Sequence, residues 1–330
     1  MNHFKIEKLN YKQEWSELQD FFKKVYSSSH ILVNQDFFEW QFVKSDFQNW
    51  IVKKDEQIVG HVGIINPEFI INGQTKRVGF WACLVVKEEI RNHGLGIFLN
   101  REIEKEMDVV YSTGINAEGI KLFKGLNWIE AGNMYRWVAK NFNKVNSQAT
   151  EITQFDNSWD ESWKKIKNKF LATTNRTSEY LNWRFINHPK TQYNVFGIKS
   201  KEGYDGYIVL RLEGKEIRAV RIVDFIAKNE EAEQKLLKAA LNFAYENKVN
   251  FIDFFCSSNM YAKSLEALGF NDADSETPVF ILPLDKNRKY INWSYKIINP
   301  ELNIKPEDWF IVKADGDKDR PQNASPVIQP

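Results

Sequence analysis

The stretch of sequence that decides the fold is Leu84-Val85-Val86-Lys87-Glu88-Glu89-Ile90-Arg91-Asn92-His93-Gly94-Leu95-Gly96. The apolar residues 78–86 predict a strand, and residues 97–103 predict a helix directly after the turn. A turn of this kind gathers unpaired backbone N–H groups and the positive end of the helix dipole, where a phosphate binds favourably. Gly94 and Gly96 have no Cβ, so the backbone can approach such a ligand closely.

The turn has the spacing Arg-x-x-Gly-x-Gly, which differs from both common phosphate loops, Gly-x-x-x-x-Gly-Lys-Ser/Thr and Gly-x-Gly-x-x-Gly. It resembles the pyrophosphate-binding segment of the GNAT superfamily of N-acyltransferases, which bind coenzyme A. The resemblance implies an acetyl-CoA site in which the pyrophosphate is held by Arg91, Asn92, His93, Gly94, Leu95 and Gly96. It also implies that the preceding strand splays from its neighbour and binds the acyl and pantetheine portions through Leu84, Val85 and Val86.

The composition argues against a broad electrostatic binding surface. Among 330 residues, 45 Lys and Arg nearly balance 44 Asp and Glu, giving a net charge of +1. We therefore expect neither a nucleic acid nor an anionic membrane as partner. The N-terminus has no apolar signal segment, and the two cysteines, Cys83 and Cys256, suit a reducing compartment. A soluble cytoplasmic protein without a bound metal is the expectation, and the oligomeric state stays open.

Internal similarity predicts a duplicated chain. The segment Phe37–Phe42 reappears as Tyr180–Phe185, and Asn116 and Asn259 stand at the same offset as the tryptophans of those segments. Both halves read as helix, strand hairpin, long strand, helix, strand, short helix and closing strand, which indicates an α/β layer structure. The prediction is two tandem GNAT-like domains, residues 1–142 and 150–330, each a mixed, mostly antiparallel sheet flanked by helices.

The two halves differ at the phosphate-binding turn. The corresponding segment of the second half, residues 223–231, contains no glycine and ends in Glu230 and Glu231, which would repel a pyrophosphate. We therefore expect a single coenzyme A site, in the first half. The second half would then shape an acceptor groove or cover the first half.

A second motif follows the next predicted strand. The run from Asn116 to Phe123 resembles the GNAT helix start Asn-x-x-Ala-x-x-Leu-Tyr, with Gly119 at the alanine position. Asn116 is expected to hydrogen-bond the cofactor or a water molecule, to cap the helix, or to do both. Phe123 stands where many family members carry a tyrosine that protonates the departing thiolate, so another group or solvent must serve here.

The general base is harder to assign, because residues 78–83 of the long strand contain no carboxylate. His61, on the preceding strand, is the candidate because its ordinary pKa lies near neutrality; the alternative is a structural histidine. Asp224 and Asp253 interrupt apolar strands of the second half and need partners if buried, so they are candidates for binding the acceptor. The alternative for both is a structural role.

The C-terminal region carries three aspartates in alternating positions, Asp315, Asp317 and Asp319. An EF-hand is excluded, because a loop starting at Asp315 places Pro326 where the bidentate glutamate belongs. This ending resembles duplicated GNAT-like proteins associated with bacterial surface-polysaccharide synthesis. That resemblance implies an amino sugar or a nucleotide-linked amino sugar as acceptor, whereas a solvated tail is the alternative.

The sequence thus predicts an N-acyltransferase that moves an acetyl group from acetyl-CoA to a primary amine in a ternary complex. A Fem-like aminoacyltransferase, also duplicated, is a rival that the retained glycine turn and the near-neutral charge disfavour. A non-catalytic module that binds acyl-CoA or a sugar is the second rival. It is favoured by Phe123 and by the missing strand carboxylate.

Overall fold

The computed structural model describes residues 4–26, 28–45, 47–91, 93–272, 277–279 and 290–319. The chain forms two compact units. The first comprises Met1–Phe69, Thr75–Gly132 and Asn292–Asn303, and the second comprises Ile70–Gln74, Asn133–Ile291 and Ile304–Pro330. Each unit therefore combines segments that lie far apart in the sequence.

The first unit is built on a seven-stranded sheet with the order β1-β2-β3-β6-β7-β17-β8. Neighbouring strands from β1 to β6 pair antiparallel, as do β7 and β17, whereas β6 and β7 are parallel. The strands are β1 (Phe4–Lys8), β2 (Gln48–Lys54), β3 (Gln57–Ile65), β6 (Val78–Val86), β7 (Val109–Thr113), β8 (Ile129–Asn133) and β17 (Asn292–Ile297). The helices are α1 (Tyr11–Val25), α2 (Gln35–Phe38), α3 (Leu95–Glu104) and α4 (Ala117–Gly125).

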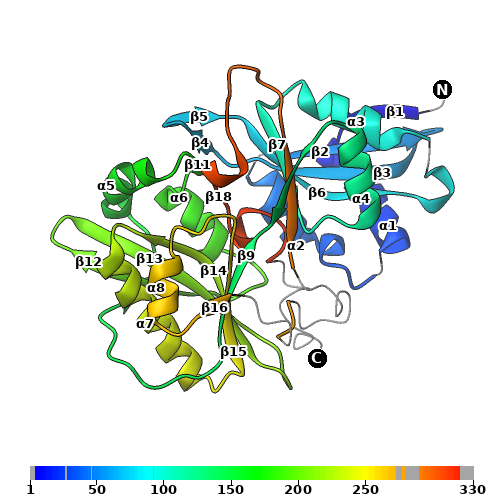
Figure 1. Ribbon diagram of the computed structural model, residues 1–330. Coiled ribbons are helices and arrows are strands. Elements are labelled where there is room, and N and C mark those ends of the chain that lie inside the picture. The colour runs from blue at the N-terminus through cyan, green and yellow to red at the C-terminus, as the bar shows by residue number, and fades with distance from the viewer. Residues whose placement is uncertain are drawn as a thin grey trace. The chain divides into compact units, whose positions relative to one another are not determined.

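Helices α3 and α4 lie side by side over one face of this sheet (Figure 1). The apolar residues of α3, Leu95, Leu99 and Ile103, recur every four positions and are buried in the core of the unit. Gly96 permits the close contact between the two helices, because a Cβ there would lie 3.0 Å from Leu122 of α4. The packing of α3 therefore fixes the turn that precedes it.

The second unit contains a seven-stranded sheet with the order β10-β12-β13-β14-β15-β9-β16. Its strands are β9 (Tyr135–Ala139), β10 (Thr150–Glu151), β12 (Asn194–Ser200), β13 (Gly203–Glu213), β14 (Ala219–Ala227), β15 (Phe251–Cys256) and β16 (Asn271–Asp272). Its helices are α5 (Asn157–Ile166), α6 (Ser178–Leu181), α7 (Glu230–Glu246) and α8 (Ala262–Ala267). Four short strands complete the description: β4 (Phe69–Ile71), β5 (Gln74–Lys76), β11 (Ala172–Thr174) and β18 (Trp309–Phe310).

The two sheets exchange one strand each: the strand beside β7 and the strand beside β15, here called the closing strands, each come from the other half of the sequence. Strand β9 follows the first unit in sequence but pairs with β15 of the second sheet, and β17 follows the second sheet but pairs with β7 of the first. The sequence predicts that each closing strand pairs within its own half. The structure differs because an apolar strand satisfies its backbone equally well at either free sheet edge, so local sequence does not determine the choice.

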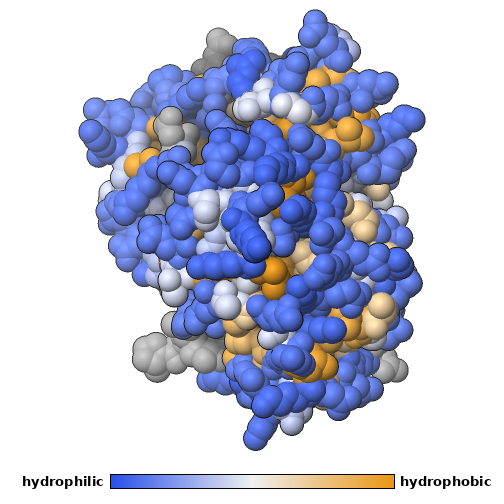
Figure 2. Space-filling model, turned by 90° about the vertical axis from the view of Figure 1, so that its left-hand side faces the viewer, coloured by the Kyte–Doolittle hydropathy of each residue, from blue (hydrophilic) through white to orange (hydrophobic). Residues whose placement is uncertain are grey.

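The predicted α/β class, with two mixed sheets flanked by helices, is confirmed. Within the described residues, no helix is long and apolar enough to cross a membrane. The face drawn in Figure 2 is largely hydrophilic, and its apolar residues occur in small separate groups. Such groups are ordinary on a protein surface and indicate no broad docking patch on that face.

Candidate acyl-CoA site

Strands β6 and β7 separate partway along their length. They pair in parallel over three residue pairs, which end at Phe80 and Tyr111, and no further ladder pair joins these two fully described strands. Beyond that point the Ser112 hydroxyl donates to the carbonyl of Trp81 at 3.2 Å. Residues 82–86 of β6 therefore form no ladder pair with β7.

A bulge on the other edge of β6 accompanies the separation. The pairing register between β3 and β6 shifts between His61 and Gly63, so that one extra residue of β6 is accommodated there. Cys83 lies in this bulge with φ of +58°, an unusual value for a residue other than glycine. Bulges bend a strand and re-aim its groups. Here the bulge leaves Cys83 and Leu84 out of the β3–β6 ladder, which resumes at Val85 and Val86. Leu84, Val85 and Val86 are all partly exposed.

The turn after β6 presents an open helix end. Gly94 is the N-terminal cap of α3 and has the left-handed φ of +72°, with no side chain to cap the helix. The first bonds inside the helix run from the N–H groups of Ile97 and Phe98 to the Gly94 carbonyl, at 3.0 and 3.3 Å. The N–H groups of Leu95 and Gly96 precede these bonds and have no acceptor among the described residues, so they can meet an anion.

The side chains of the turn are arranged around this open end. Arg91 and His93 are exposed, and Nδ1 of His93 lies 3.1 Å from the carbonyl oxygens of Ile90 and Arg91. The side chain of Leu95, the first residue of α3, is buried in the core, so only its backbone N–H can contact a ligand at this turn. The predicted residue Asn92 lies outside the described residues. The turn suits a pyrophosphate, because the open helix end has no intruding Cβ and follows an exposed arginine at position 91.

Helix α4 begins at Asn116, whose side chain accepts the N–H of Gly119 at 2.8 Å. Asn116 is exposed, so the capping role does not prevent it from meeting a ligand as well. A Cβ on Gly119 would lie 2.7 Å from the Ile115 side chain and 3.1 Å from Oδ1 of Asn116. Glycine at the usual alanine position therefore belongs to this cap.

Phe123 is buried in an aromatic cluster with Trp81 and Trp128. Its ring stacks on Trp128 with centroids 4.0 Å apart and an interplanar angle of 7°. Trp81 stands perpendicular to both rings, at 5.7 Å from Phe123 and 5.9 Å from Trp128. Sequence reasoning singled out Phe123 but missed the two tryptophans, because nothing local indicated that they would meet it.

His61 lies on the face of the first sheet opposite α3 and α4. It is completely buried, and its Nε2 is 3.0 Å from the side-chain oxygen of Asn49 on β2. The ring meets Phe22 of α1 edge-on at 4.9 Å and approaches Phe38 of α2 at 6.4 Å. The histidine thus has a defined partner and an enclosed position, two features common to buried structural histidines.

The space beyond the parallel pair is occupied in the second sheet. Strands β14 and β15 pair in parallel up to Ile222 and Phe254. Past this point Val312 forms an antiparallel bridge with Cys256. Because β9 pairs with Cys256 on one edge of β15, Val312 occupies the other edge, which faces β14. In the second sheet, the C-terminal segment therefore fills the place that corresponds to the gap between β6 and β7 in the first sheet.

The helix after β14 is also closed to an anion. Asn229 caps α7 and accepts the N–H of Ala232 at 3.0 Å, so one of the free donors is already satisfied. Three glutamates follow in the first turn, Glu230, Glu231 and Glu233. They complement the positive end of the helix dipole internally. The electrostatic conditions for phosphate binding are therefore absent from this end of α7.

Asp224 and Asp253 are buried and held by arginines. Asp224 contacts Arg176 at 3.0 Å and accepts the Tyr207 hydroxyl at 2.6 Å. Asp253 contacts Arg136 at 2.9 Å and also pairs with Arg221. Burial alone would raise the pKa of Asp253, but the charges of Arg221 and Arg136 outweigh it and hold the pKa below its ordinary range. Both carboxylates are thus neutralised within the unit.

The arginine partners were missed from the sequence, although aspartates inside apolar strands signal that such partners exist. The C-terminal aspartates supply the remaining counter-charges. Asp315 contacts Arg176 at 2.8 Å, and Asp319 contacts Arg211 at 2.6 Å. Asp317 lies 3.0 Å from Lys318. Asp315 and Asp319 are therefore buried ion-pair partners rather than parts of a solvated tail.

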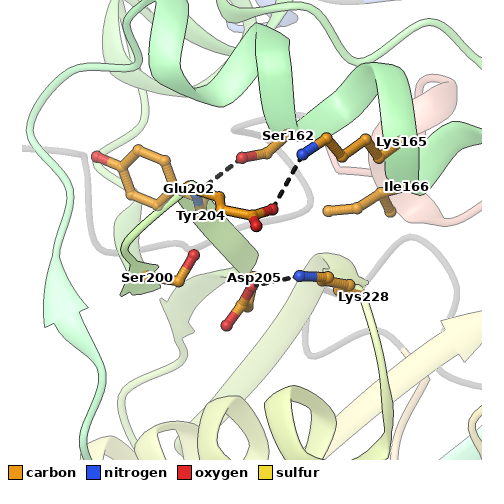
Figure 3. Close-up of a pocket in the computed structure, with 8 residues that line it drawn as sticks. All are labelled: Ser162, Lys165, Ile166, Ser200, Glu202, Tyr204, Asp205 and Lys228. Carbon is orange, nitrogen blue, oxygen red and sulfur yellow. Dashed lines mark hydrogen bonds and ion pairs between the residues drawn. The ribbon is translucent and has the colours of Figure 1, made fainter.

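A shallow pocket lies in the second unit between the end of α5 and the β12–β13 turn (Figure 3). Its charged side chains form two ion pairs, Lys165 with Glu202 at 3.0 Å and Lys228 with Asp205 at 3.3 Å. Each charged group drawn there is already paired. The pocket therefore lacks the unpaired donors that distinguish the open end of α3.

The comparisons with known proteins agree with this geometry. Residues 13–112 match the model of the acetyltransferase (GNAT) family. This match covers less than a third of the 330 residues. The match contains strand β6, the glycine turn and α3, so the predicted enzyme class is confirmed. A search among curated proteins finds no match.

Solved structures share the fold over most of the chain. A probable N-acyltransferase of Enterococcus faecalis is 14% identical, with a TM-score of 0.60. The alignment covers 91% of this chain and 73% of the neighbour. A GCN5-related N-acetyltransferase of Anabaena variabilis is 13% identical, with a TM-score of 0.58. The alignment covers 90% of this chain and 73% of the neighbour. N-myristoyltransferase of Saccharomyces cerevisiae with bound myristoyl-CoA is 11% identical, with a TM-score of 0.58. The alignment covers 93% of this chain and 80% of the neighbour. At these identities the likeness concerns the fold.

Proposed function

We propose that the chain is an acetyl-CoA-dependent N-acyltransferase with one cofactor site per chain, in the first unit. The observation that supports this proposal best is the open end of α3 at the end of a bulged and splayed strand. Arg91, His93 and the Gly94–Gly96 backbone would hold the pyrophosphate, together with Asn92. The open edge of β6 at Leu84–Val86 would pair with the amides of the pantetheine arm, and Asn116 would meet the cofactor near α4.

The asymmetry between the units supports a single site. In the second unit Val312 fills the corresponding gap, and Asn229 together with the glutamates of α7 occupies the helix end. The equal strand order of the two sheets supports a duplication of the chain, with the ranges 1–142 and 150–330 as its two copies. On this proposal only the first copy keeps cofactor chemistry, and the second gives structure and acceptor selection.

Calorimetry with acetyl-CoA tests the cofactor part of the proposal. We expect saturable binding with one molecule per chain, and competition by coenzyme A. Two equivalent sites, or no binding at millimolar cofactor, would contradict it. Titration with myristoyl-CoA, the ligand bound in the yeast neighbour, then reports whether a long acyl chain is also accepted.

The acceptor is proposed to be a primary amine, with amino sugars and nucleotide-linked amino sugars as the first class to test. The support is the resemblance of the C-terminal ending to proteins of surface-polysaccharide synthesis. A thiol-release screen over amino sugars, nucleotide-linked sugars, polyamines and amino acids separates these classes. Cofactor binding without turnover of any amine would favour the non-catalytic module instead, a rival supported by the absence of a hydroxyl at Phe123.

His61 remains our proposal for the group that accepts the amine proton, with Asp224, Asp253 or solvent as alternatives. Because the ring is enclosed by Phe22 and Phe38, the proton would have to arrive through a water relay. General-base assistance is worth about 10²–10⁴-fold in rate, so His61→Gln should lower turnover by that order and remove the acid limb of the pH profile.

His30→Gln is the matched control for this variant, because His30 is a partly buried histidine of the same unit that stacks on Tyr26 at 4.0 Å. It should leave turnover unchanged. If His61→Gln keeps wild-type turnover and an unchanged acid limb, the histidine is structural. Acetyl-CoA affinity and thermal unfolding of both variants show whether the fold is intact.

A further inference from the structure

The aromatic cluster of Trp81, Phe123 and Trp128 contains two buried hydrogen-bond donors without acceptors. The exposed fractions of Trp81 and Trp128 are 4% and 5%, and neither indole Nε1 has a hydrogen-bond partner among the described residues. Buried polar groups in proteins are nearly always satisfied, so each exception requires an explanation. Two such donors on rings that both pack against Phe123 point to an acceptor that arrives with a ligand.

The cluster lies at the closed end of the splay. Trp81 is the first residue of β6 after its last ladder pair with β7, and its carbonyl accepts the Ser112 hydroxyl across the strands. From Val86, beside the phosphate turn, to Trp81 the strand covers about 17 Å at roughly 3.3 Å per residue. An extended pantetheine arm can cover such a span. If the pyrophosphate binds at Gly94, the thioester therefore reaches the neighbourhood of Trp81.

We propose that the indole N–H groups of Trp81 and Trp128 donate hydrogen bonds to the sulfur of the bound acyl-CoA and stabilise the departing thiolate. In this step the amine nitrogen forms a bond to the thioester carbon, and the carbon–sulfur bond breaks with its electron pair passing to sulfur. The amine proton passes to the base proposed above or to solvent. The indoles keep their protons and act as donors throughout. The inference rests on the proposed acyl-CoA function and names the groups that serve its leaving group.

Phe123 completes the arrangement by holding Trp128 in place. The parallel stack at 4.0 Å fixes the plane of Trp128, and the perpendicular contact at 5.7 Å fixes Trp81. A hydrogen bond to a charged acceptor in a water-poor site is stronger than one in water. The two indole N–H groups have no acceptor among the described residues and would gain one when the sulfur of acyl-CoA binds. Because the hydrogen bonds to the charged thiolate are stronger than those to the neutral thioester, they favour thiolate departure.

The test replaces each indole by a ring without the donor, in Trp81→Phe and Trp128→Phe. Loss of one hydrogen bond to a charged group should lower turnover by roughly 10–100-fold. Trp50→Phe is the matched control: Trp50 is buried in the same core, and its Nε1 already donates to the Gln48 side chain at 3.3 Å. The control should leave turnover and the thiol pKa of bound coenzyme A unchanged.

Ultraviolet titration of the coenzyme A thiol on the protein supplies a readout that a packing defect would not move. We expect the pKa of the bound thiol to be depressed in the wild type and to rise in both variants, with acetyl-CoA affinity little changed. If either phenylalanine variant fails to fold, benzothienylalanine at the same position keeps the shape of the ring and removes only the N–H.

Unchanged turnover and an unchanged thiol pKa in folded variants would overturn the inference, and the donors would then be satisfied by neighbouring ring faces. That outcome leaves cofactor binding by the wild type intact. Failure of the wild type to bind acetyl-CoA would instead overturn the proposed function itself. The two failures are therefore distinguishable.

Discussion

Strand β6 in the first unit and strand β14 in the second hold the same place in sheets of equal strand order. Beyond β6 the sheet edge is open, and the turn leads through Gly94 to a helix end without a side-chain cap. Beyond β14 the gap is filled by Val312, and the next helix is capped by Asn229. The comparison shows that one topology gives a potential cofactor site in one unit and a closed structural element in the other.

The sheet faces opposite α3 and α7 differ in the same sense. In the first unit this face carries His61 against the aromatic residues Phe22 and Phe38. In the second it carries buried ion pairs, among them Asp253 with Arg221. Buried charges are tolerated only when paired, and removal of one partner is costly. On this face of the second unit, Asp253 and Arg221 are therefore held by each other.

The largest effect is expected from Gly94→Asp, which would remove the difference between the two helix ends. A carboxylate beside the N–H groups of Leu95 and Gly96 repels a pyrophosphate and competes for the same donors. Affinity for acetyl-CoA should fall at least about 100-fold, as measured by calorimetry. The left-handed φ adds about 1–2 kcal/mol of strain, which a folded domain withstands.

Gly269→Asp is the control for that variant. Gly269 has φ of +82° and open space around its would-be Cβ, but it lies after α8 in the second unit. It should share the strain and leave cofactor affinity unchanged. Unaltered affinity in a folded Gly94→Asp protein would show that the turn does not bind the pyrophosphate.

Next in size is Asp253→Asn, which tests whether the second unit depends on its buried charges. The substitution leaves Arg136 and Arg221 without their shared counter-charge and should reduce the free energy of unfolding by about 3–5 kcal/mol. Denaturant unfolding measures this loss. Glu230→Gln, which breaks the exposed pair with Lys263, should change stability little. A loss in Asp253→Asn no greater than in the control would contradict the comparison.

A pH effect is expected from His188 in the second unit. Burial and the charge of Arg184 lower the pKa of His188 from 6.5 to about 3, and its Nδ1 accepts the N–H of Thr191 at 3.0 Å. The unfolded chain takes up a proton below pH 6.5, whereas the folded chain does so only near pH 3. Stability should therefore fall across this window, on the order of 2 kcal/mol.

His188→Asn keeps an acceptor side chain and removes the titration. The variant should lose this part of the pH dependence when unfolding is followed by denaturant at pH 7 and at pH 4. An identical fall in stability in both proteins would assign the acid sensitivity to other groups.

The smallest effect is expected from Asn229→Ala, which opens the end of α7. Loss of the cap to Ala232 should cost about 1 kcal/mol of stability. Acetyl-CoA should still bind with one molecule per chain, because the glutamates of α7 and the filled gap remain. Appearance of a second cofactor site would show that the cap alone separates the two units.

Much of the fold and of the candidate site could be predicted because the controlling rules are local. The strand, the glycines and the helix are contiguous, and only glycine adopts φ of +72° at Gly94 without strain. The capping role of Asn116 likewise depends on a residue three positions away. The family match over residues 13–112 covers this contiguous part of the chain.

The features missed from the sequence depend on residues that are distant along the chain. The exchange of β9 and β17, the Val312–Cys256 bridge and the pairing of Trp81 with Trp128 each join segments that no local pattern connects. The enclosure of His61 and the arginine partners of Asp224 and Asp253 are of the same kind.

The sequence by itself therefore determined the α/β class, the glycine turn and the position of the open helix end, because backbone geometry follows from neighbouring residues. Only the tertiary structure decided which strand closes each sheet, which gap stays open and which polar groups are buried with partners. Such choices depend on competition among segments for the same sheet edges and counter-charges. That competition is resolved only when the whole chain packs.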